Sequence, residues 1–450
     1  MKIRAILLAL TVCVGMNIPA VPAAADGEEY YEIEIDDTKQ GWYRIASTGE
    51  RTYYIDGERV RGLTEIEGRL FYFDENGVML TDTWQKLGGD SYYFGKKGYA
   101  LSGRQIIDGT DYIFGSDCIL LRENRRTNIV KTSPAPYTYD DMSEDIEKLA
   151  KRYPELIEYG IIGVTADSRN IYDIVMGDPG ADKQIVIQAS CHAREYMTSL
   201  LVMEQLEYCL NGYYTDEYNG VLFKDLFDEY AIHIVPMLNH DGVTISQLGI
   251  DGINDETIRE ALPEMYENTV ENGYTDYTEE RYYQRWKANA LGVDLNNNFN
   301  GRWETLKGAE SPAGWSYKGE YPESEAESAA ITSLIRGLSN PLTVVSYHAT
   351  GSVLWWDYGQ TGEFMERCKE QAELISSLTG YPLNPYSKSS SGGLSDWIIA
   401  EYYGDIVPET IEIGKGEAPM KMSEYRDIWK RNKDVIPALA YLYEYGETEE

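Results

Sequence analysis

Two apolar runs in this chain each end on a histidine, although the chain of 450 residues has only four histidines. Residues 184–191 have the composition of a buried strand and lead into His192, and residues 342–347 lead into His348 in the same way. Because the carboxyl ends of parallel strands meet at one edge of a sheet, we expect these two histidines to lie close together. The pattern therefore favours a chain that folds around parallel strands.

A carboxylate joins this pair of histidines. Glu195 follows His192 by three residues. Two imidazoles and one carboxylate are the ligand set of a catalytic zinc site, which keeps a fourth position open. A histidine and a glutamate at this spacing are often only neighbours on a surface turn, so His348 is what favours the metal interpretation. We predict one zinc ion per chain, held by His192, Glu195 and His348, and assign no metal to His233, expected in the core, or to His240.

Helical and strand patterns alternate from about residue 137 onward. This alternation predicts an α/β fold, with a mixed, largely parallel sheet and helices on both faces. Helices are predicted at residues 140–153, 197–210, 323–338 and 423–445, and further strands at residues 157–164 and 230–238.

An aromatic and glycine-rich repeat precedes this region. Between residues 41 and 122, aromatic triplets recur at intervals of about twenty residues, and turn-forming residues follow each one. The triplets are residues 53–55, 71–73, 92–94 and 112–114. Each unit is expected to form a short β-hairpin, and a single hairpin cannot bury its own aromatic side chains. We therefore predict a small all-β solenoid of stacked hairpins.

These units resemble the repeats of bacterial cell-wall-binding proteins, including the choline-binding type. Residues 41–43 and 71–80 carry the likeness. The resemblance implies that the N-terminal unit binds a cell-wall polymer, for which cation–π attraction is one means. The alternative is that the aromatic side chains only pack the solenoid, so no ligand-binding residue is assigned among them.

The first 25 residues have the pattern of a secretory signal peptide. A basic start is followed by an apolar stretch to about residue 18 and by small residues up to Ala25. A membrane anchor is the alternative, but the apolar stretch is short for a span. We therefore expect a secreted, extracellular protein, associated with the cell wall through its repeats, with no membrane span after cleavage. The predicted parts are a signal peptide (1–25), an acidic segment (26–40), the repeats (41–122), a linker (123–136) and a catalytic domain (137–446).

Charge and cysteine content narrow the classes of partner and of fold. The formal net charge is −35, and a chain this acidic repels the phosphate backbone, so no nucleic-acid partner is expected. Cys13 lies in the predicted signal peptide. The four remaining cysteines are too widely spaced for a disulfide framework; they are Cys118, Cys191, Cys209 and Cys368.

Six motifs within residues 137–446 resemble, in order, those of zinc carboxypeptidases of the carboxypeptidase A type. They are residues 192–195, 239–242, 292–299, 346–348, 391–397 and 409–414. The resemblance implies zinc binding by His192, Glu195 and His348, and it implies that Glu412 is the general base for hydrolysis of peptide bonds by a zinc-activated water. Isoleucines on both sides of Glu412 indicate a buried strand, where a carboxylate without a function would be costly.

The substrate-holding residues agree only in part with the family pattern. The resemblance implies that Arg194 lies near the substrate carbonyl and carboxylate and that Asn296 holds the terminal carboxylate. Asn297 stands where the family has an arginine that holds the same carboxylate, and Lys388 stands at the position of a mobile tyrosine. Lys287 replaces an arginine that polarises the scissile carbonyl, and it keeps the charge without the planar fork.

The leading interpretation is a secreted zinc metallocarboxypeptidase anchored near the bacterial cell wall. Asn297 weakens the recognition of a free carboxylate, unless Lys388, Arg302 or another cation replaces the missing arginine. One alternative is therefore an endopeptidase that cuts the γ-D-glutamyl–diamino acid bond of peptidoglycan stems, since such enzymes share this scaffold. The other is a catalytically impaired wall-binding protein on the same fold. The expected substrate is a peptide or a peptidoglycan peptide.

Overall fold

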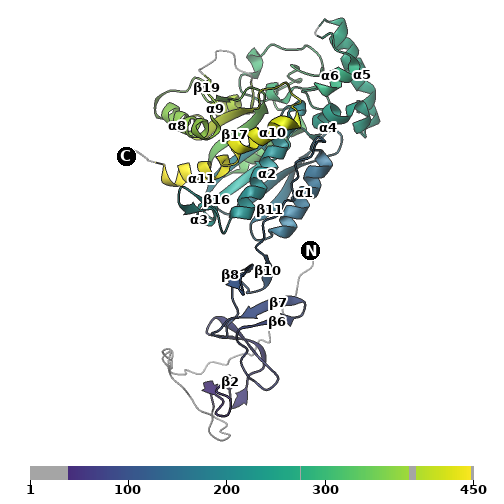
Figure 1. Cartoon of the computed structure of the whole chain (residues 1–450). Helices are drawn as coiled ribbons and strands as arrows, with labels where there is room; N and C mark the ends of the chain where they lie inside the picture. Colours follow the sequence, from purple (N-terminus) through teal and green to yellow (C-terminus); the bar gives the residue numbers. More distant parts are fainter. Residues whose placement is uncertain (1–38, 274, 385–391, 447–450) are drawn as a thin grey trace. The chain divides into compact units, whose positions relative to one another are not determined.

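The structure, a computed structural model, describes residues 39–273, 275–384 and 392–446. The chain divides into two compact units, residues 1–123 and 124–450 (Figure 1). The predicted signal peptide, most of the acidic segment and Lys388 lie outside the described residues. Within the described ranges, every helix is too short or too polar to cross a membrane.

The N-terminal unit consists of antiparallel hairpins, and each aromatic triplet lies in the second strand of its hairpin. The turns Asp56-Gly57, Glu67-Gly68 and Asp108-Gly109 have positive φ at both residues, as in the type I′ turn whose twist matches a hairpin. The strands are β1 (Gly41–Arg44), β2 (Arg51–Ile55), β3 (Glu58–Arg59), β4 (Gly62–Ile66), β5 (Arg69–Phe73), β6 (Thr83–Leu87), β7 (Asp90–Phe94), β8 (Gly103–Ile107), β9 (Thr110–Phe114) and β10 (Leu120–Glu123).

Aromatic side chains connect successive hairpins. The ring of Trp42 lies 5.0 Å from that of Phe71 in the next hairpin, and the ring of Trp84 lies 5.0 Å from that of Tyr112. Phe73 and Phe94 are completely buried between them. The hairpins thus bury jointly what none could bury alone, which confirms the predicted small β-hairpin unit.

An eight-stranded mixed sheet forms the centre of the second unit. The strand order is β11-β12-β16-β13-β17-β20-β18-β19. Strands β16, β13, β17 and β20 run parallel, whereas β11–β12, β12–β16 and β18–β20 are antiparallel pairs. The bounds are β11 (Ile157–Val164), β12 (Asn170–Gly177), β13 (Lys183–Ala189), β16 (Tyr230–Val235), β17 (Pro341–Ala349), β18 (Val353–Trp355), β19 (Leu383–Asn384) and β20 (Val407–Ile413). A short hairpin, β14 (Glu217–Tyr218) and β15 (Val221–Leu222), lies outside this sheet.

Helices cover both faces of the sheet, as predicted. Ile185 and Ile187 face a core with helices α1, α2, α3, α10 and α11, while Val186 between them faces a core with α7 and α9. The helices are α1 (Tyr139–Arg152), α2 (Met197–Gly212), α3 (Phe223–Phe227), α4 (His240–Leu248), α5 (Glu256–Glu271), α6 (Glu279–Gln284), α7 (Ala326–Gly337), α8 (Gly362–Thr379), α9 (Leu394–Glu401), α10 (Tyr425–Asn432) and α11 (Val435–Tyr445).

The C-terminal helix differs from the prediction of one long helix at residues 423–445. The chain forms two helices, and the break falls at Lys433 and Asp434. Pro437 lies in the first turn of α11. Proline has no N–H to donate to the carbonyl of Lys433, and its ring clashes with that carbonyl inside a continuous helix, so the prediction of a single helix was wrong.

The segment before α1 is attached to the α/β unit. The backbone N–H groups of Ile129 and Val130 donate to the carboxylate of Glu207 in α2, at 2.7 and 2.9 Å. Thr127 donates its hydroxyl to the same carboxylate at 2.6 Å. Glu207 is almost fully buried, so three donors from this segment satisfy a buried charge.

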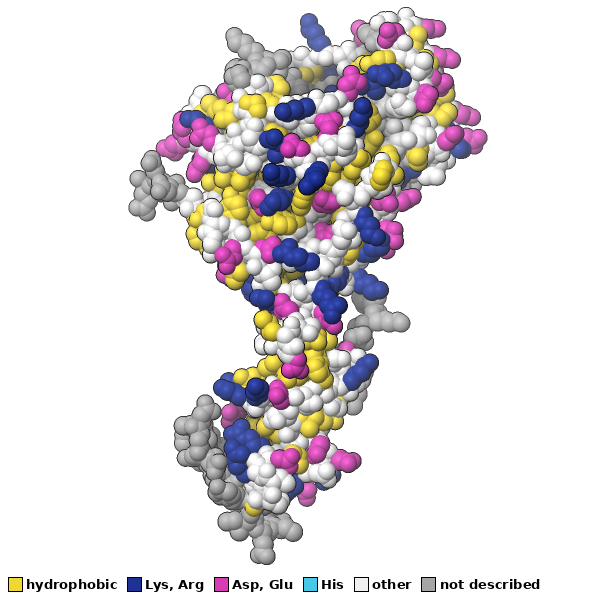
Figure 2. All heavy atoms as spheres, viewed as in Figure 1, with side chains coloured by type: hydrophobic (Ala, Val, Ile, Leu, Met, Phe, Trp, Pro, Cys, Tyr) yellow, Lys and Arg dark blue, Asp and Glu magenta, His cyan; other side chains and the backbone are white. Residues whose placement is uncertain are grey.

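On one face of the molecule, acidic and basic side chains are intermixed. Figure 2 shows Lys and Arg side chains interspersed with Asp and Glu on the face in view. The four cysteines of the described residues are all free thiols, in agreement with the prediction of no disulfide framework.

Candidate active site

Strands β13 and β17 carry the three predicted metal ligands to one edge of the sheet. Beyond the end of β13 the chain forms a short 3-10 helix, Ala193–Glu195, which brings Glu195 back toward His192. His348 is the penultimate residue of β17. Because β13 and β17 are adjacent and parallel, their carboxyl ends meet and bring His192 and His348 together.

The geometry of these three side chains fits one zinc ion. The Nδ1 atoms of His192 and His348 lie 3.1 Å apart, and they contact the two carboxylate oxygens of Glu195 at 2.9 and 3.1 Å. All three side chains are buried. Two ring nitrogens and a carboxylate that converge on one buried point form the donor set of zinc, so His192, Glu195 and His348 could hold one zinc ion.

Asp294 and Lys287 form a chain of contacts that ends on the metal ligand His192. Asp294 Oδ1 lies 3.4 Å from His192 Nε2, and its Oδ2 lies 3.2 Å from Lys287 Nζ. Burial tends to raise the pKa of Asp294, but the charge of Lys287 and the contact with His192 hold that pKa below its ordinary value. An ionised carboxylate at Nε2 favours the tautomer that leaves Nδ1 free for a metal. Sequence reasoning assigned no role to Asp294, although an acid within residues 292–299 was a signal for one.

Glu412 lies beside the metal ligands on the next strand. It is the register partner of His348 across β17 and β20. Its Oε2 atom is buried and has no hydrogen-bond partner among the described residues. Burial and the charge of Glu195 raise the pKa of Glu412 to about 7. A carboxyl group that titrates near neutrality is suited both to accept and to release a proton.

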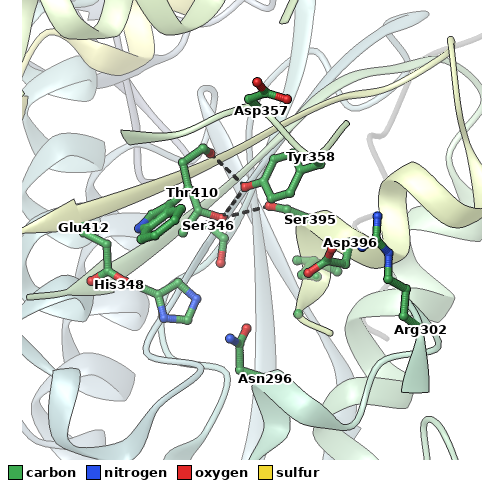
Figure 3. A pocket seen from close by; sticks show the side chains of 13 residues that line it. Asn296, Arg302, Ser346, His348, Asp357, Tyr358, Ser395, Asp396, Thr410 and Glu412 are labelled. Carbon is green, nitrogen blue, oxygen red and sulfur yellow. Dashed lines mark hydrogen bonds between the residues drawn. The ribbon is translucent and has the colours of Figure 1, made fainter. Parts of the chain in front are cut away.

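A pocket of about 200 Å³ opens beside His348 and Glu412 (Figure 3). Its lining combines apolar groups, including Leu394 and the ring of Trp355, with hydroxyl groups, carboxylates, one amide and one guanidinium, so it carries both signs of charge. Besides His348 and Glu412, the side chains that line it include Asn296, Arg302, Ser346, Trp355, Asp357, Tyr358, Ser395, Asp396 and Thr410.

The predicted substrate-binding residues do not all reach this pocket. Asn296 lines it, whereas Asn297 is not among its described lining residues. Arg194 is half-buried, its Nη1 donates to the carbonyl of Arg285 at 3.2 Å, and burial lowers its pKa. Arg302 lines the pocket, and its guanidinium forms no ion pair with another described residue. Of the cations considered at the missing arginine, Arg302 lines the same pocket as Asn296, whereas Lys388 lies outside the described residues.

The two remaining histidines lie outside the site, as predicted. His233 is buried in β16, and its Nδ1 lies 2.8 Å from Asp173 Oδ2 on the neighbouring strand β12. His240 is completely buried at the start of α4, and burial and the charge of Arg169 lower its pKa to about 3, which keeps the ring neutral.

Comparison with known proteins agrees with this architecture. The family described as "Zinc carboxypeptidase" matches residues 142–444. Gamma-D-glutamyl-L-diamino acid endopeptidase 1 of Lysinibacillus sphaericus is 30% identical over 312 residues, which cover 68% of this chain and 72% of that protein. Mast cell carboxypeptidase A of Homo sapiens is 24% identical over 235 residues, covering 51% of this chain and 48% of that protein.

The same fold occurs in solved structures. The crystal structure of thrombin activatable fibrinolysis inhibitor superposes with a TM-score of 0.53 at 19% identity, covering 70% of this chain and 76% of that one. The family match spans most of the α/β unit and includes all three side chains that could hold zinc. The chain therefore belongs to the zinc carboxypeptidase family.

Proposed function

We propose that this protein is a secreted zinc peptidase that cleaves the bond between γ-D-glutamate and a diamino acid in peptidoglycan stem peptides. The observation that carries the proposal is the lining of the pocket beside His348 and Glu412, where Arg302 and the carboxylates of Asp357 and Asp396 occur together. Diamino acids in such stems present an ammonium group and, in diaminopimelate, a second carboxylate. An apolar side chain in this pocket would leave its polar groups without partners, which disfavours such substrates.

The chemistry of hydrolysis follows from the residues around the triad. A zinc ion held there supplies a Lewis acid that polarises a carbonyl and makes water more acidic. Glu412 takes the proton of the attacking water and passes it to the leaving amine. The positive charges of Arg194 and Lys287 act on Glu412 and lower its pKa, which supports a part for them in stabilising negative charge on the carbonyl oxygen.

Arg302 supplies the positive charge for carboxylate binding that Asn297 does not. Its guanidinium and the amide of Asn296 line one pocket, where both can donate to a substrate that carries a carboxylate. The backbone at Arg302 is held in place, because the N–H and the hydroxyl of Thr305 donate to its carbonyl at 3.0 and 2.9 Å. The next residue, Trp303, is fixed by Lys318, whose Nζ lies 3.9 Å from the indole ring. Because these contacts order the backbone around Arg302, less conformational entropy is lost when Arg302 binds a carboxylate.

A second candidate function is a metallocarboxypeptidase that removes ordinary C-terminal residues. The observation that favours it is the same pairing of Asn296 with Arg302, because a terminal carboxylate of any peptide would fit there. The two functions differ in the side chain that the pocket accepts rather than in the chemistry of Glu412 and zinc.

The proposal includes binding of the N-terminal hairpin unit to the bacterial cell wall. The pattern of residues 1–25 supports export, and the similarity to an enzyme named for a γ-D-glutamyl-L-diamino acid bond supports a wall substrate. Within the hairpin unit, Trp84 is 38% exposed although its ring lies within 5.2 Å of those of Tyr93 and Tyr112. Exposed clustered aromatics are suited to bind a sugar or a cation.

Three substrates separate the candidate functions. Zinc-loaded protein is incubated with L-alanyl-γ-D-glutamyl-diaminopimelate, with a blocked dipeptide ending in phenylalanine and with one ending in arginine, and products are identified by mass spectrometry. We expect cleavage of the first alone, and loss of that cleavage with a chelator. Cleavage of only the ordinary dipeptides would establish the carboxypeptidase instead. Stoichiometric zinc with no cleavage of any substrate, including peptidoglycan fragments, would indicate a catalytically impaired wall-binding protein.

A further inference from the structure

Arg285 forms an ion pair with Glu417 outside the pocket and outside the metal triad. Its Nη1 lies 2.9 Å from Glu417 Oε2, and Nη2 of Arg281 lies 3.6 Å from the same oxygen. Arg281 belongs to α6, and Arg285 directly follows that helix. Glu417 lies in the loop after β20, five residues beyond Glu412. Two guanidinium groups thus share one carboxylate close in sequence to the groups that perform the chemistry.

The backbone at Arg285 is hydrogen-bonded to the segment that carries the metal ligands. Arg194 Nη1 donates to the carbonyl of Arg285 at 3.2 Å, and the N–H of Ala193 donates to the carbonyl of Lys287 at 3.1 Å. Ala193 and Arg194 directly precede Glu195, one of the three side chains that could hold zinc. The guanidinium of Arg285 is therefore carried on a segment that is fixed beside the metal site.

Glu417 is a replaceable partner of Arg285. The side chain of Glu417 is 75% exposed, whereas that of Arg285 is 18% exposed. An ion pair with one partner so exposed to water contributes little to stability, so another carboxylate can take the place of Glu417. Apart from this pair, the guanidinium of Arg285 donates no hydrogen bond to a described residue, so it keeps N–H groups for a second carboxylate oxygen.

The aromatic ring of Tyr277 orders both guanidinium groups. The Cζ atoms of Arg281 and Arg285 lie 5.1 and 5.7 Å from its centre. Cation–π attraction at these distances favours fixed positions for the two charges. The pair therefore has its orientation before a ligand carboxylate arrives, which lowers the entropic cost of binding.

The proposed substrate has a free carboxylate close to the scissile bond. In a γ-D-glutamyl peptide the chain continues through the side-chain carbonyl, so the α-carboxylate of the D-glutamyl residue stays free. Only a few bonds separate this carboxylate from the scissile carbonyl. Arg194 and Lys287 are assigned to that carbonyl, and Arg285 is two residues from Lys287, so its guanidinium is suited to reach the α-carboxylate.

We propose that Arg285 and Arg281 bind the free α-carboxylate of the D-glutamyl residue, and that Glu417 occupies this site until the substrate displaces it. This inference rests on the proposed function, which it extends from the diamino acid to the D-glutamyl side of the bond. An ordinary peptide has no free α-carboxylate on this side, so it gains nothing from the two guanidinium groups. The site thus selects for the γ-linkage.

The test compares two peptides that differ in one group. One is L-alanyl-γ-D-glutamyl-diaminopimelate, and in the other the D-glutamyl residue carries an α-carboxamide. For the unaltered protein we expect kcat/KM for the carboxylate peptide to exceed that for the carboxamide by about tenfold, because a hydrogen bond between charged groups is lost. Arg285→Gln should remove this preference and leave the value for the carboxamide unchanged, and Arg285→Lys should restore part of it. The exposed Arg426→Gln is the control.

Glu417→Gln should act in the opposite direction. The neutral amide no longer competes for Arg285, so kcat/KM for the carboxylate peptide should rise by about twofold to fivefold. The value for the carboxamide should stay the same. A purely structural role of Glu417 would instead lower both values. Glu370→Gln, an exposed change in α8, is the matched control.

Binding measurements separate this inference from the proposed function. Calorimetry of both peptides with zinc-loaded Glu412→Gln protein measures affinity without turnover. Tighter binding of the carboxylate peptide, lost in the double variant with Arg285→Gln, supports the inference even if no stem peptide is cleaved. Equal binding of the two peptides, or no binding of either, overturns it. A loss in the double variant that is the same for both peptides also overturns it, even where cleavage of stem peptides stands.

Discussion

His348 and Glu412 are register partners on the adjacent parallel strands β17 and β20. Two residues earlier on the same strands, Ser346 and Thr410 are also partners, and both line the pocket. Residues two apart on a strand face the same side of the sheet. One pair of strands therefore positions a metal ligand, the proton acceptor and part of the substrate pocket through backbone hydrogen bonds.

Glu412→Gln should abolish turnover and leave zinc binding intact. The amide has the same shape but cannot accept the proton of water, so kcat should fall by about 10²-fold to 10⁴-fold. Zinc content by atomic absorption and kcat with a stem peptide measure the two effects. Glu401→Gln, an exposed change at the end of α9, is the control. Retained activity in Glu412→Gln would show that another group removes the proton.

Asp294→Asn should weaken zinc binding, although Asp294 is not a ligand. The amide loses the charge that orients His192 and that pairs with Lys287. Such supporting changes cost about 10-fold to 100-fold in metal affinity. Competition with a chromogenic chelator gives the zinc dissociation constant, with the exposed Asp182→Asn as control. An affinity equal to that of the control would remove Asp294 from the metal site.

Arg302→Ala should raise KM for peptides with a free carboxylate at the position that Asn296 contacts. We expect about a tenfold rise, since a hydrogen bond to a charged group is lost. Arg302→Lys should restore part of it, because lysine keeps the charge without the fork. The same peptide with a terminal amide is the internal comparison, and Lys307→Ala in the same loop is the control variant. A rise that is as large for the amide would contradict carboxylate binding by Arg302.

Glu327 should make the protein less stable as the pH rises. Burial and the charges of Asp241 and Glu325 raise the pKa of Glu327 to about 8, above its value in the unfolded chain. The folded state then holds this proton more tightly, so the stabilisation present below about pH 4.3 is lost as the pH rises to about 8, by up to ~1.4 kcal/mol per pH unit. Glu327→Gln should flatten this dependence.

Urea unfolding of zinc-loaded protein at pH 6 and pH 8 measures this effect. The unfolding free energy of Glu327→Gln, relative to that of the unaltered protein, should be higher at pH 8 than at pH 6. The control Glu401→Gln should show no such change with pH. Parallel pH profiles for all three proteins would mean that Glu327 is ionised in the folded state.

Trp84→Ala should weaken binding to purified peptidoglycan and leave cleavage of soluble peptides unchanged. Trp84 is exposed within an aromatic cluster, so its loss removes a surface for stacking or for a cation. Sedimentation of the protein with peptidoglycan sacculi measures the bound fraction. Ile106→Ala, a more exposed change in the same unit, is the matched control. Equal sedimentation of both variants would argue that Trp84 only packs the solenoid.

Sequence patterns were sufficient for the α/β fold and for the metal triad. The apolar runs before His192 and His348 are strands β13 and β17, and their adjacency follows from parallel pairing. This information is local, since each strand and its terminal histidine lie within a few residues. The hairpins were predictable for the same reason, because turn residues alternate with the aromatic triplets, although the turn of a hairpin lies before its triplet, as at Glu67-Gly68 and Asp108-Gly109.

The pocket could not be predicted in this way, because distant segments build it. Tyr358 reaches the pocket only because β18 pairs antiparallel with β20, and a three-residue strand has no recognisable period. Arg302, six residues after Asn296, lies in a loop and has a left-handed backbone conformation that its side-chain type does not reveal. The break before α11 was not predicted, because the pattern of apolar residues continues across it. Pro437 nevertheless ends the continuous helix, since it cannot donate to the carbonyl of the preceding turn.

The attachment of residues 127–130 to Glu207 decides where the two units can be separated. A cut at residue 136, before α1, would take away three hydrogen-bond donors from the almost fully buried carboxylate of Glu207. Water would have to replace these three donors, and the packing of Val130 against the core would be lost, which is destabilising. An excised peptidase should therefore begin at Asn124, so that residues 124–138, which precede the first helix, stay with the enzyme rather than with the repeats.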